Sequence, residues 1–228
     1  MNLTNKVVVI TGGSKGFGKS LAMFLKKEEC QVVISSNNIE DLKKASQELS
    51  VDFSLTDVTK PEDLKILANY VNNKYGRIDI WINNAGIQIA PSLVEDVNID
   101  KLKRLFNINF FGYFYGCQTA LRIMKVQKSG MIINVDSTAG LDGKPMISAY
   151  CCSKFAIKGL TESIRKEISE EIKVYAIYPG GMQTEIYQEE YPADIKEYML
   201  VDDVVKKVIE NLKSKNPELD LIIKRPTK

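Results

Sequence analysis

Short apolar runs rich in β-branched residues alternate along the chain with longer amphipathic segments, and this alternation constrains the fold more than any other feature. The runs predict strands at Val7–Thr11, Gln31–Ser35, Val51–Leu55, Asp79–Asn83, Gly130–Asp136, Lys173–Tyr178 and Leu219–Ile223. The segments between them predict helices at Gly18–Lys27, Ile39–Leu49, Pro61–Lys74, Lys101–Lys125, Ala149–Ser169 and Val201–Ser214. Strands that are apolar throughout and joined by helices are typical of a parallel sheet covered on both faces. We therefore predict one α/β domain over residues 1–228, with a doubly wound parallel sheet of about seven strands flanked by helices.

Charge and composition exclude several classes of function. The chain has 31 basic and 29 acidic side chains, a formal net charge of +2, and no histidine. It therefore has no Ser-His-Asp triad, no histidine-ligated metal and no histidine pH switch, and we predict no metal site. The near-neutral balance provides no basic field for nucleic acid. The uncharged stretch Leu105–Leu121 contains asparagines and glycines and is closely flanked by charges, so we expect a buried or interface helix and no membrane partner.

The four cysteines are Cys30, Cys117, Cys151 and Cys152. They form no C-x-x-C pair, and adjacent cysteines are poorly suited to a structural bridge. We interpret them as small buried thiols in a reducing compartment. The strand-like run Val7–Ile10 begins almost at once, so we expect no signal peptide. These features together predict a cytoplasmic protein.

The turn after the first predicted strand is rich in glycine. It reads Thr11-Gly12-Gly13-Ser14-Lys15-Gly16-Phe17-Gly18 and leads directly into a predicted helix. A tight turn lets backbone amides approach a pyrophosphate, and the start of the helix offers its unpaired N–H groups to the anion. The spacing is T-G-x-x-x-G-x-G, which differs from the general G-x-G-x-x-G pattern. A purely structural turn is the alternative, but the strand before it and the helix after it favour nucleotide binding.

The end of the second predicted strand bears on the choice of nucleotide. Many dinucleotide sites hold the ribose 2′-hydroxyl with a carboxylate at this place. Here the segment Ile34–Asn38 has no acid, and Ser36 and Asn37 occupy its end. A missing carboxylate removes repulsion against a 2′-phosphate, and Lys15 can supply a positive partner. We therefore expect NADP as the cofactor, with NAD as the alternative. The alternative interpretation of Lys15 is a solvated charge on the loop that binds no phosphate.

A tyrosine and a lysine four residues apart, Tyr150 and Lys154, share one face of a predicted helix. The spacing alone is unspecific, because a second such pair, Tyr70 and Lys74, occurs in this chain. Tyr70 has no hydroxyl or amide constellation before it, so we interpret that pair as packing. Tyr150 instead follows a strand whose end carries Ser137, and strand ends are where a doubly wound sheet presents its chemistry. We expect Ser137 to meet Tyr150 across the cleft.

These motifs together resemble the short-chain dehydrogenase/reductase family over nearly the whole chain. The matching features, in order, are the turn Thr11–Gly18, Asp57-Val58, Asn83-Asn84-Ala85-Gly86, Asn109, Ser137, Tyr150 with Lys154, and Pro179-Gly180 with Thr184. The resemblance implies a Rossmann-type fold and hydride transfer between NAD(P) and an alcohol or carbonyl.

The resemblance also implies catalytic roles. Tyr150 would be the general acid in reduction, and Ser137 would hold the substrate oxygen. Lys154 would bind the nicotinamide ribose and lower the pKa of Tyr150 by about two units, because a unit charge about 5 Å away is worth roughly 3 kcal/mol. Asn109 would anchor a water that links Lys154 to solvent; an amide that satisfies helix backbone is the alternative.

The cofactor contacts implied by the resemblance span the chain. They are Gly12, Ser14, Lys15, Gly16, Phe17, Gly18, Ser36, Asn37, Asp57, Val58, Asn84, Ala85, Gly86, Tyr150, Lys154, Pro179, Gly180, Met182 and Thr184. Asp57 would contact the adenine amino group, Asn83 would line the groove, and Thr184 would bond the carboxamide. Alternatively, Thr184 is only a helix cap before Glu185, and Asn83 and Asn84 tie neighbouring strands together.

Two features bear on the substrate. Asp136 stands where the family more often has a small hydroxyl residue, which alters the polarity beside Ser137. The predicted substrate lid, residues 184–200, is short and indicates an open site. Several apolar residues are candidates for the substrate pocket, and they favour a small hydrophobic ketone or aldehyde as substrate. Each of them could instead pack in the core. The candidates are Ile87, Leu93, Leu141, Met146, Met182 and Ile186.

Two other functions compete with carbonyl reduction. The first is a 3-oxoacyl-carrier-protein reductase, which would need a basic rim at the cleft to bind an acidic carrier protein. Lys125 and Lys128 could form part of such a rim. The acidic lid and Glu170-Glu171 argue against this function. A non-catalytic NADP(H) sensor with the same fold is the other alternative. By the same resemblance, Leu105–Leu121 and Ala149–Ser169 would form homodimer or homotetramer contacts.

Overall fold

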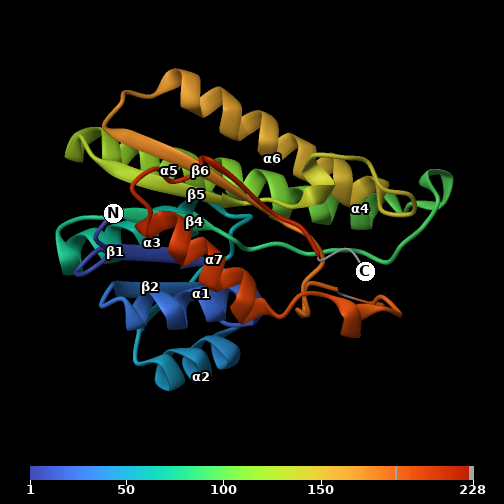
Figure 1. Cartoon of the computed structure of the whole chain (residues 1–228), viewed down its shortest axis with the longest axis horizontal. Coiled ribbons are helices and arrows are strands. Elements are labelled where there is room, and N and C mark those ends of the chain that lie inside the picture. Colours follow the sequence, from blue (N-terminus) through green and yellow to red (C-terminus); the bar gives the residue numbers. More distant parts are fainter. Residues whose placement is uncertain (188, 226–228) are drawn as a thin grey trace.

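The predicted strands form one parallel sheet in the computed structural model, which describes residues 1–187 and 189–225 (Figure 1). They are β1 (Val7–Thr11), β2 (Gln31–Ser36), β3 (Asp52–Leu55), β4 (Ile80–Asn83), β5 (Gly130–Val135), β6 (Ile172–Pro179) and β7 (Asp220–Ile223). Their order across the sheet is β3-β2-β1-β4-β5-β6-β7, and every neighbouring pair is parallel. The predicted doubly wound α/β fold is confirmed.

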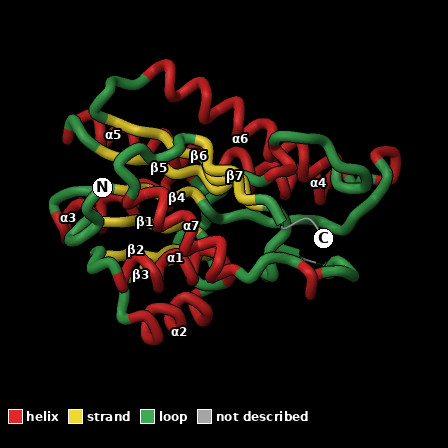
Figure 2. Tube along the Cα trace, viewed as in Figure 1, coloured by secondary structure: helices red, strands yellow, loops and turns green. Residues whose placement is uncertain are grey.

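Helices cover both faces of the sheet, as Figure 2 shows. They are α1 (Gly16–Lys27), α2 (Ile39–Leu49), α3 (Pro61–Tyr75), α4 (Ile99–Phe106), α5 (Gly112–Gln127), α6 (Ser148–Glu167) and α7 (Val201–Lys213). Successive side chains of β1 enter opposite cores: Val8 and Ile10 pack with α1, α2 and α7, whereas Val7 and Val9 pack with α3, α5 and α6. Burial on both faces explains why these strands are apolar without alternation.

The winding of the sheet reverses between β1 and β4. From β1 the chain proceeds through β2 to β3 on one side, and from β4 it proceeds to β7 on the other. Because all strands are parallel, the loops that follow β1, β4, β5 and β6 emerge at one edge. That edge, next to the reversal, is where doubly wound sheets bind their ligands.

The long helix predicted over 101–125 is wrong as a single element. The structure has α4, then a π-helical turn at Asn107–Phe111, then α5. Asn109 lies buried inside this turn, and its side chain bonds to the loop after β4 instead of to helix backbone. Single π-turns inside α-helices occur frequently at functional sites.

The cysteines are all free, but they are not all buried. Cys30, Cys117 and Cys151 are buried and Cys152 is exposed, so the prediction of four buried thiols is wrong for Cys152. Consecutive helical residues point about 100° apart, which turns Cys152 outward when Cys151 faces the core. Within the described parts of the chain, none of the helices is long and apolar enough to span a membrane.

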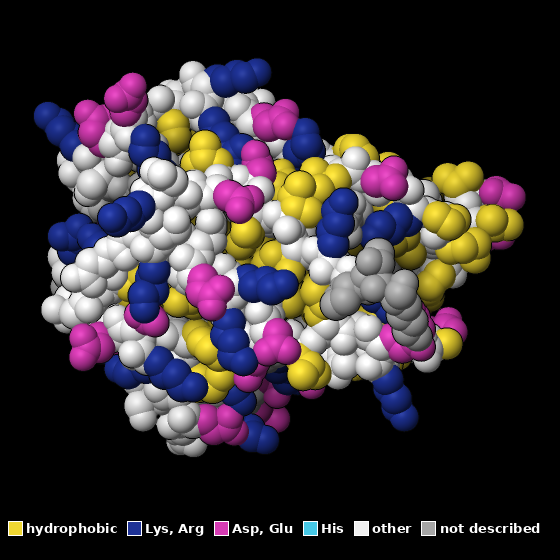
Figure 3. All heavy atoms as spheres, in the orientation of Figure 1, with side chains coloured by type: hydrophobic (Ala, Val, Ile, Leu, Met, Phe, Trp, Pro, Cys, Tyr) yellow, Lys and Arg dark blue, Asp and Glu magenta, His cyan; other side chains and the backbone are white. Residues whose placement is uncertain are grey.

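Hydrophobic side chains gather at one end of the visible surface in Figure 3, the end that carries the loop before α4 in Figure 1. Leu93, Val94 and Ile99 are exposed in this region. The loop is tied to the segment before α6, because the Ser92 N–H donates to the Met146 carbonyl at 2.8 Å. An apolar rim therefore stands beside the ligand-binding edge of the sheet.

Candidate active site

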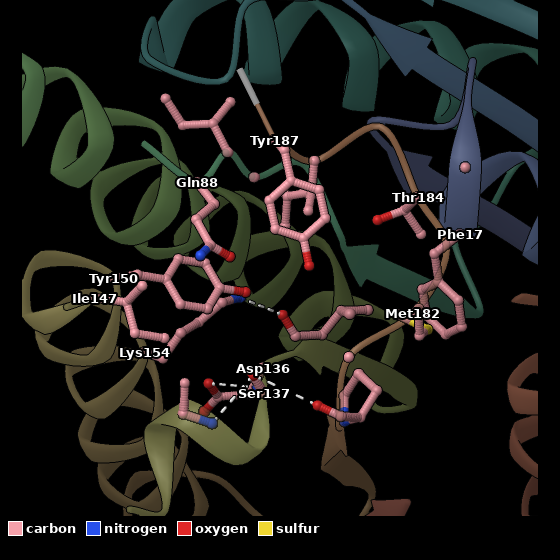
Figure 4. Close-up of a pocket in the computed structure, with 18 of the residues that line it drawn as sticks. Phe17, Gln88, Asp136, Ser137, Ile147, Tyr150, Lys154, Met182, Thr184 and Tyr187 are labelled. Carbon is pink, nitrogen blue, oxygen red and sulfur yellow. Dashed lines mark hydrogen bonds between the residues drawn. The ribbon is translucent and has the colours of Figure 1, made fainter. Parts of the chain in front are cut away.

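A cavity of about 1170 Å³ opens at the carboxyl ends of the strands (Figure 4). Its walls come from the loops after β1 to β6, from α6 and from the lid segment, residues 184–200, of which residue 188 lies outside the described residues. Pockets for drug-sized ligands usually measure about 300–1,000 Å³. This cavity has room for a ligand larger than a simple metabolite, which fits a dinucleotide beside a small substrate.

The glycine-rich turn after β1 has the geometry of a phosphate cradle. Gly12 has a φ of +64°, and a Cβ on Gly18 would lie 2.3 Å from the Gly12 carbonyl oxygen. The turn and the start of α1 are therefore packed too closely for larger residues. Lys15 precedes α1 without capping it through its side chain, and the first turn of α1 holds no acidic residue. The helix start thus presents backbone N–H groups that suit an anion.

The predicted cofactor contacts mostly face this cavity. The lining includes Gly12, Lys15, Gly16, Phe17, Gly18, Ser36, Asn37, Asp57, Val58, Asn84, Ala85, Gly86, Tyr150, Lys154, Pro179, Gly180, Met182 and Thr184. Ser14 is buried and does not belong to the lining, because the turn directs it toward the interior. Spacing within a turn does not reveal which side chains point inward.

Lys15 is exposed, as the alternative of a solvated loop charge expects, but it is not without charged partners. Its ammonium lies 2.8 Å from the Asp41 carboxylate at the start of α2 and 3.8 Å from that of Glu185 in the lid segment. The hydrogen bond and charge of Asp41 raise the pKa of Lys15. The sequence identified Lys15 but not the competing carboxylate.

The two asparagines that end β4 have different roles. Asn83 is buried, accepts a hydrogen bond from the Trp81 indole at 2.8 Å and donates to Asn134 at 2.9 Å. Asn83 therefore ties β4 to β5, as the structural alternative proposed. Asn84 lines the cavity and donates from its amide to the carbonyls of Thr11 and Gly12 at 2.9 and 3.0 Å. It fixes the glycine-rich turn against β4.

The predicted catalytic side chains meet at one wall of the cavity. Tyr150 and Lys154 project from one face of α6, and Ser137 follows β5 opposite them (Figure 4). Tyr150 is 8% exposed and Lys154 is 3% exposed. The Lys154 ammonium lies 5.6 Å from the centre of the Tyr150 ring. The structure thus brings together the phenol, the ammonium and the hydroxyl that sequence reasoning proposed.

The expected effect of Lys154 on Tyr150 is not found in this structure. Burial raises the pKa of Tyr150, and the negative charge of Asp136 raises it further, whereas a hydrogen bond from Ser137 opposes the rise. The expectation of a lowered pKa is therefore wrong here. Its physical error was to treat the phenol as solvated and the ammonium as its only charged neighbour.

Asp136 is a cavity-lining residue whose surroundings the sequence did not reveal. It is 2% exposed and lines the cavity. Its Oδ1 accepts the Ser137 N–H at 2.9 Å, while its Oδ2 has no hydrogen-bond partner. The departure from a small hydroxyl residue was visible in the sequence, but its burial beside Lys154 was not.

Asn109 is fully committed to the loop after β4. Its Oδ1 accepts from the Ile87 N–H at 2.9 Å, and its amide donates to the Ile87 carbonyl at 2.9 Å and to Ser153 at 3.2 Å. Both amide hydrogens are therefore used. The Asn109 side chain thus makes hydrogen bonds to backbone groups, as the alternative interpretation expected, but these groups belong to a loop and not to a helix. The water-anchoring role stays a prediction.

The lid segment closes the cavity from the side of β6. The Gln88 N–H donates to the Ile186 carbonyl at 2.9 Å, and Gly181 and Gln183 exchange backbone bonds with Met199. Thr184 lines the cavity and caps no helix, since the next helical turn is Ile195–Glu197. The Tyr187 hydroxyl points into the cavity from the lid segment (Figure 4); nothing in the sequence singled it out.

The apolar pocket candidates are confirmed with one exception. The cavity is lined by Ile87, Leu141, Met146, Met182 and Ile186. Leu93 is 52% exposed on the loop before α4 and is absent from the lining, so that prediction is wrong. Hydrophobicity alone did not distinguish the rim of the cavity from its wall.

Comparisons with known proteins agree with this geometry. The sequence matches the family described as short chain dehydrogenase over residues 6–195. It is 34% identical over 214 residues to an uncharacterized oxidoreductase of Staphylococcus saprophyticus, covering 91% of this chain and 86% of that protein. The structure of ElxO with NADP bound has a TM-score of 0.87 and 29% identity, covering 97% of this chain and 98% of ElxO. The structure of NAD+-bound xylitol dehydrogenase has a TM-score of 0.86 and 28% identity, covering 98% of this chain and 99% of the xylitol dehydrogenase chain.

Proposed function

Since the chain belongs to the short-chain dehydrogenase/reductase family and is an NAD(P)-dependent oxidoreductase, we propose that it transfers a hydride between NADP(H) and a small hydrophobic ketone or aldehyde. The observation that carries the proposal is the convergence of Tyr150, Lys154 and Ser137 on the wall of a cavity that also contains the glycine-rich turn. The bound nicotinamide supplies or accepts the hydride.

The chain's own residues supply the proton and the orientation. In reduction the carbonyl carbon gains a hydride and its oxygen gains the proton of the Tyr150 phenol. Ser137 donates a hydrogen bond that positions this oxygen, and Lys154 holds the nicotinamide ribose.

The preference for NADP is supported by the end of the cavity near β2. Ser36 and Asn37 line it where NAD sites often place an acid, and Lys15 stands in the adjoining turn. The ElxO structure contains NADP, whereas the xylitol dehydrogenase structure contains NAD+. Since Lys15 is paired with Asp41, a 2′-phosphate gains its positive partner by displacing that carboxylate.

The preference for a small apolar carbonyl is supported by the wall of the cavity near Tyr150. The side chains there include Ile87, Ile147 and Ile186. The side chains of Gln88 and Tyr187 also line the cavity (Figure 4), and they suit one or two hydrogen bonds to a substrate.

The test follows NADPH absorbance with a panel of ketones and aldehydes. We expect turnover by the wild type and a loss of at least about 10²-fold in Tyr150→Phe, the size typical of a general acid. Tyr70→Phe, at the other Tyr-x-x-x-Lys pair, is the matched control and should retain wild-type rates. Equal turnover by the wild type and Tyr150→Phe would refute the proposal, and tight NADPH binding without any turnover would favour a sensor.

The proposal extends to assembly and location. Phe111 at the end of the π-helical turn, Phe114 in α5 and Phe155 in α6 are exposed, and such aromatic side chains are enriched at protein interfaces. They support a homodimer or homotetramer built on these helices. The free cysteines support a cytoplasmic location, where thiols stay reduced. A monomer by light scattering at micromolar concentration would contradict the assembly.

A further inference from the structure

Asp136 lies on the cavity wall next to Ser137, at the carboxyl end of β5. Its own N–H donates to the Ile177 carbonyl at 2.8 Å, so the residue is fixed by the sheet. The preceding carbonyl, that of Val135, accepts the Lys154 ammonium at 2.9 Å. The carboxylate and the ammonium are therefore held by neighbouring positions of the same strand.

Gly140 brings Asp136 and α6 close together. A Cβ on Gly140 would lie 2.7 Å from Asp136 Oδ1 and 3.1 Å from the backbone carbon of Lys154. Only glycine allows this approach of the turn after β5 to the helix. The Oδ2 of Asp136 is left without a hydrogen-bond partner although the side chain is almost wholly buried. An unpartnered buried carboxylate is costly unless its charge serves a neighbour.

The charged and titratable groups around Asp136 come from four elements. They are Lys154, Lys158 and Tyr150 on α6, Tyr113 on α5, Tyr178 on β6 and Asp220 on β7. Burial raises the pKa of Asp136 to about 7, and Lys154 is the charge that lowers it most. Asp136 in turn is the charge that opposes the effect of burial on Lys154. The same carboxylate acts on the Tyr150 phenol.

We propose that Asp136 is a positioning residue whose negative charge keeps the Lys154 ammonium and the Tyr150 phenol protonated as the pH rises above neutral, so that carbonyl reduction continues into the alkaline range. The inference rests on the proposed function, because it concerns the same reaction. Asp136 does so through its charge and does not touch the substrate.

Both effects of the carboxylate act in the same direction. A nearby negative charge favours the protonated form of an amine and of a phenol alike. Burial lowers the pKa of Lys154, and Asp136 raises it again; burial raises the pKa of Tyr150, and Asp136 raises it further. Reduction requires both protons, so its rate should fall at high pH only when one of them is lost.

The test is the pH profile of kcat/KM for reduction of the best carbonyl found in the panel, with NADPH. Asp136→Asn and Asp136→Ser should move the alkaline limb to lower pH by about one unit, which corresponds to losing one nearby charge. Asp203→Asn on α7, an exposed substitution with the same change in net charge, should leave the limb in place.

Each outcome decides the matter. The serine side chain in Asp136→Ser is smaller than aspartate, so this variant serves for the test if Asp136→Asn does not fold. Circular dichroism and NADPH binding show whether each variant is folded. An unmoved alkaline limb in variants that turn over would refute the inference. So would loss of turnover at every pH in a folded variant that binds NADPH. If Tyr150→Phe is as active as the wild type, the proposed function itself fails, which is a separate result.

Discussion

The Lys154 ammonium donates a hydrogen bond of 2.9 Å to the carbonyl of Val135, the last residue of β5. A long, flexible side chain from α6 is thereby fixed to the sheet and held over the rings of Tyr113 and Tyr150 at 5.3 and 5.6 Å. Its position does not depend on a bound ligand, so the cationic part of the site is already organised. Preorganised charge of this kind is usually the largest contribution to catalysis.

Lys154→Met should therefore lower kcat/KM for carbonyl reduction by about 10²-fold or more, because the site loses a buried charge near the reacting atoms. NADPH affinity should also fall, since Lys154 holds the ribose in the proposed function. Steady-state kinetics and fluorescence titration measure the two effects. Lys166→Met, an exposed substitution on the same helix, should change neither; a similar loss in that control would indicate a general effect on α6.

Lys15 and Asp41 should set cofactor preference in opposite directions. Lys15→Ala should weaken NADPH binding by about tenfold, because a charged hydrogen bond to phosphate is worth about 1.5–3 kcal/mol. NADH binding should change little. Asp41→Asn frees Lys15 from its 2.8 Å ion pair and should strengthen NADPH binding. Parallel fluorescence titrations measure both, and equal effects on NADH and NADPH would contradict this assignment.

Two helical glycines should respond oppositely to alanine. Gly18→Ala places a Cβ 2.3 Å from the Gly12 carbonyl and 2.5 Å from the Asn84 amide, so it should destabilise the fold by about 1–3 kcal/mol and impair NADPH binding. Gly159→Ala on α6 meets nothing within 4 Å and should stabilise by about 0.5–1 kcal/mol. Denaturant unfolding measures both; stabilisation by Gly18→Ala would contradict the packing argument.

Stability should fall in acid partly through Asp52, the first residue of β3. Hydrogen bonds from Lys74 and Tyr75 lower the pKa of Asp52 despite its partial burial. A lowered pKa contributes stability that is present above the unfolded-state value and is lost as pH falls through the folded-state value. Asp52→Asn should thus cost about 1 kcal/mol at pH 7 and much less near pH 2. Urea unfolding at both pH values measures this, and an equal cost at both would refute it.

The sequence predicted the sheet well because its central strands are buried on both faces. A run such as Val7–Thr11 can satisfy its side chains only inside a sandwich of helices, so its bounds were visible without the structure. Ser137 and Tyr150 could be placed together for a related reason. One ends a strand and the other follows on the next helix, and parallel topology brings strand ends to a common edge.

The features that the sequence missed depend on contacts between distant segments. The pairing of Lys15 with Asp41 requires α2 to approach the glycine-rich turn. The π-turn around Asn109 depends on hydrogen bonds to Ile87, far back in the chain. The raised pKa of Tyr150 depends on burial by the lid segment and on Asp136. Periodicity describes which residues are buried, but not which polar groups they are buried with.

The backbone bonds that anchor the lid segment have a practical consequence for engineering. The Gln88 N–H and the backbone of Met199 hold this segment through peptide groups, and the side chains of Glu189 and Asp194 anchor it through ion pairs with Lys101 and Arg225. Exchanging the side chains at Ile186 and Tyr187 should therefore reshape the entrance while the main chain stays in place. These two positions are the natural choice for a saturation library that seeks new carbonyl substrates without a loss of folding.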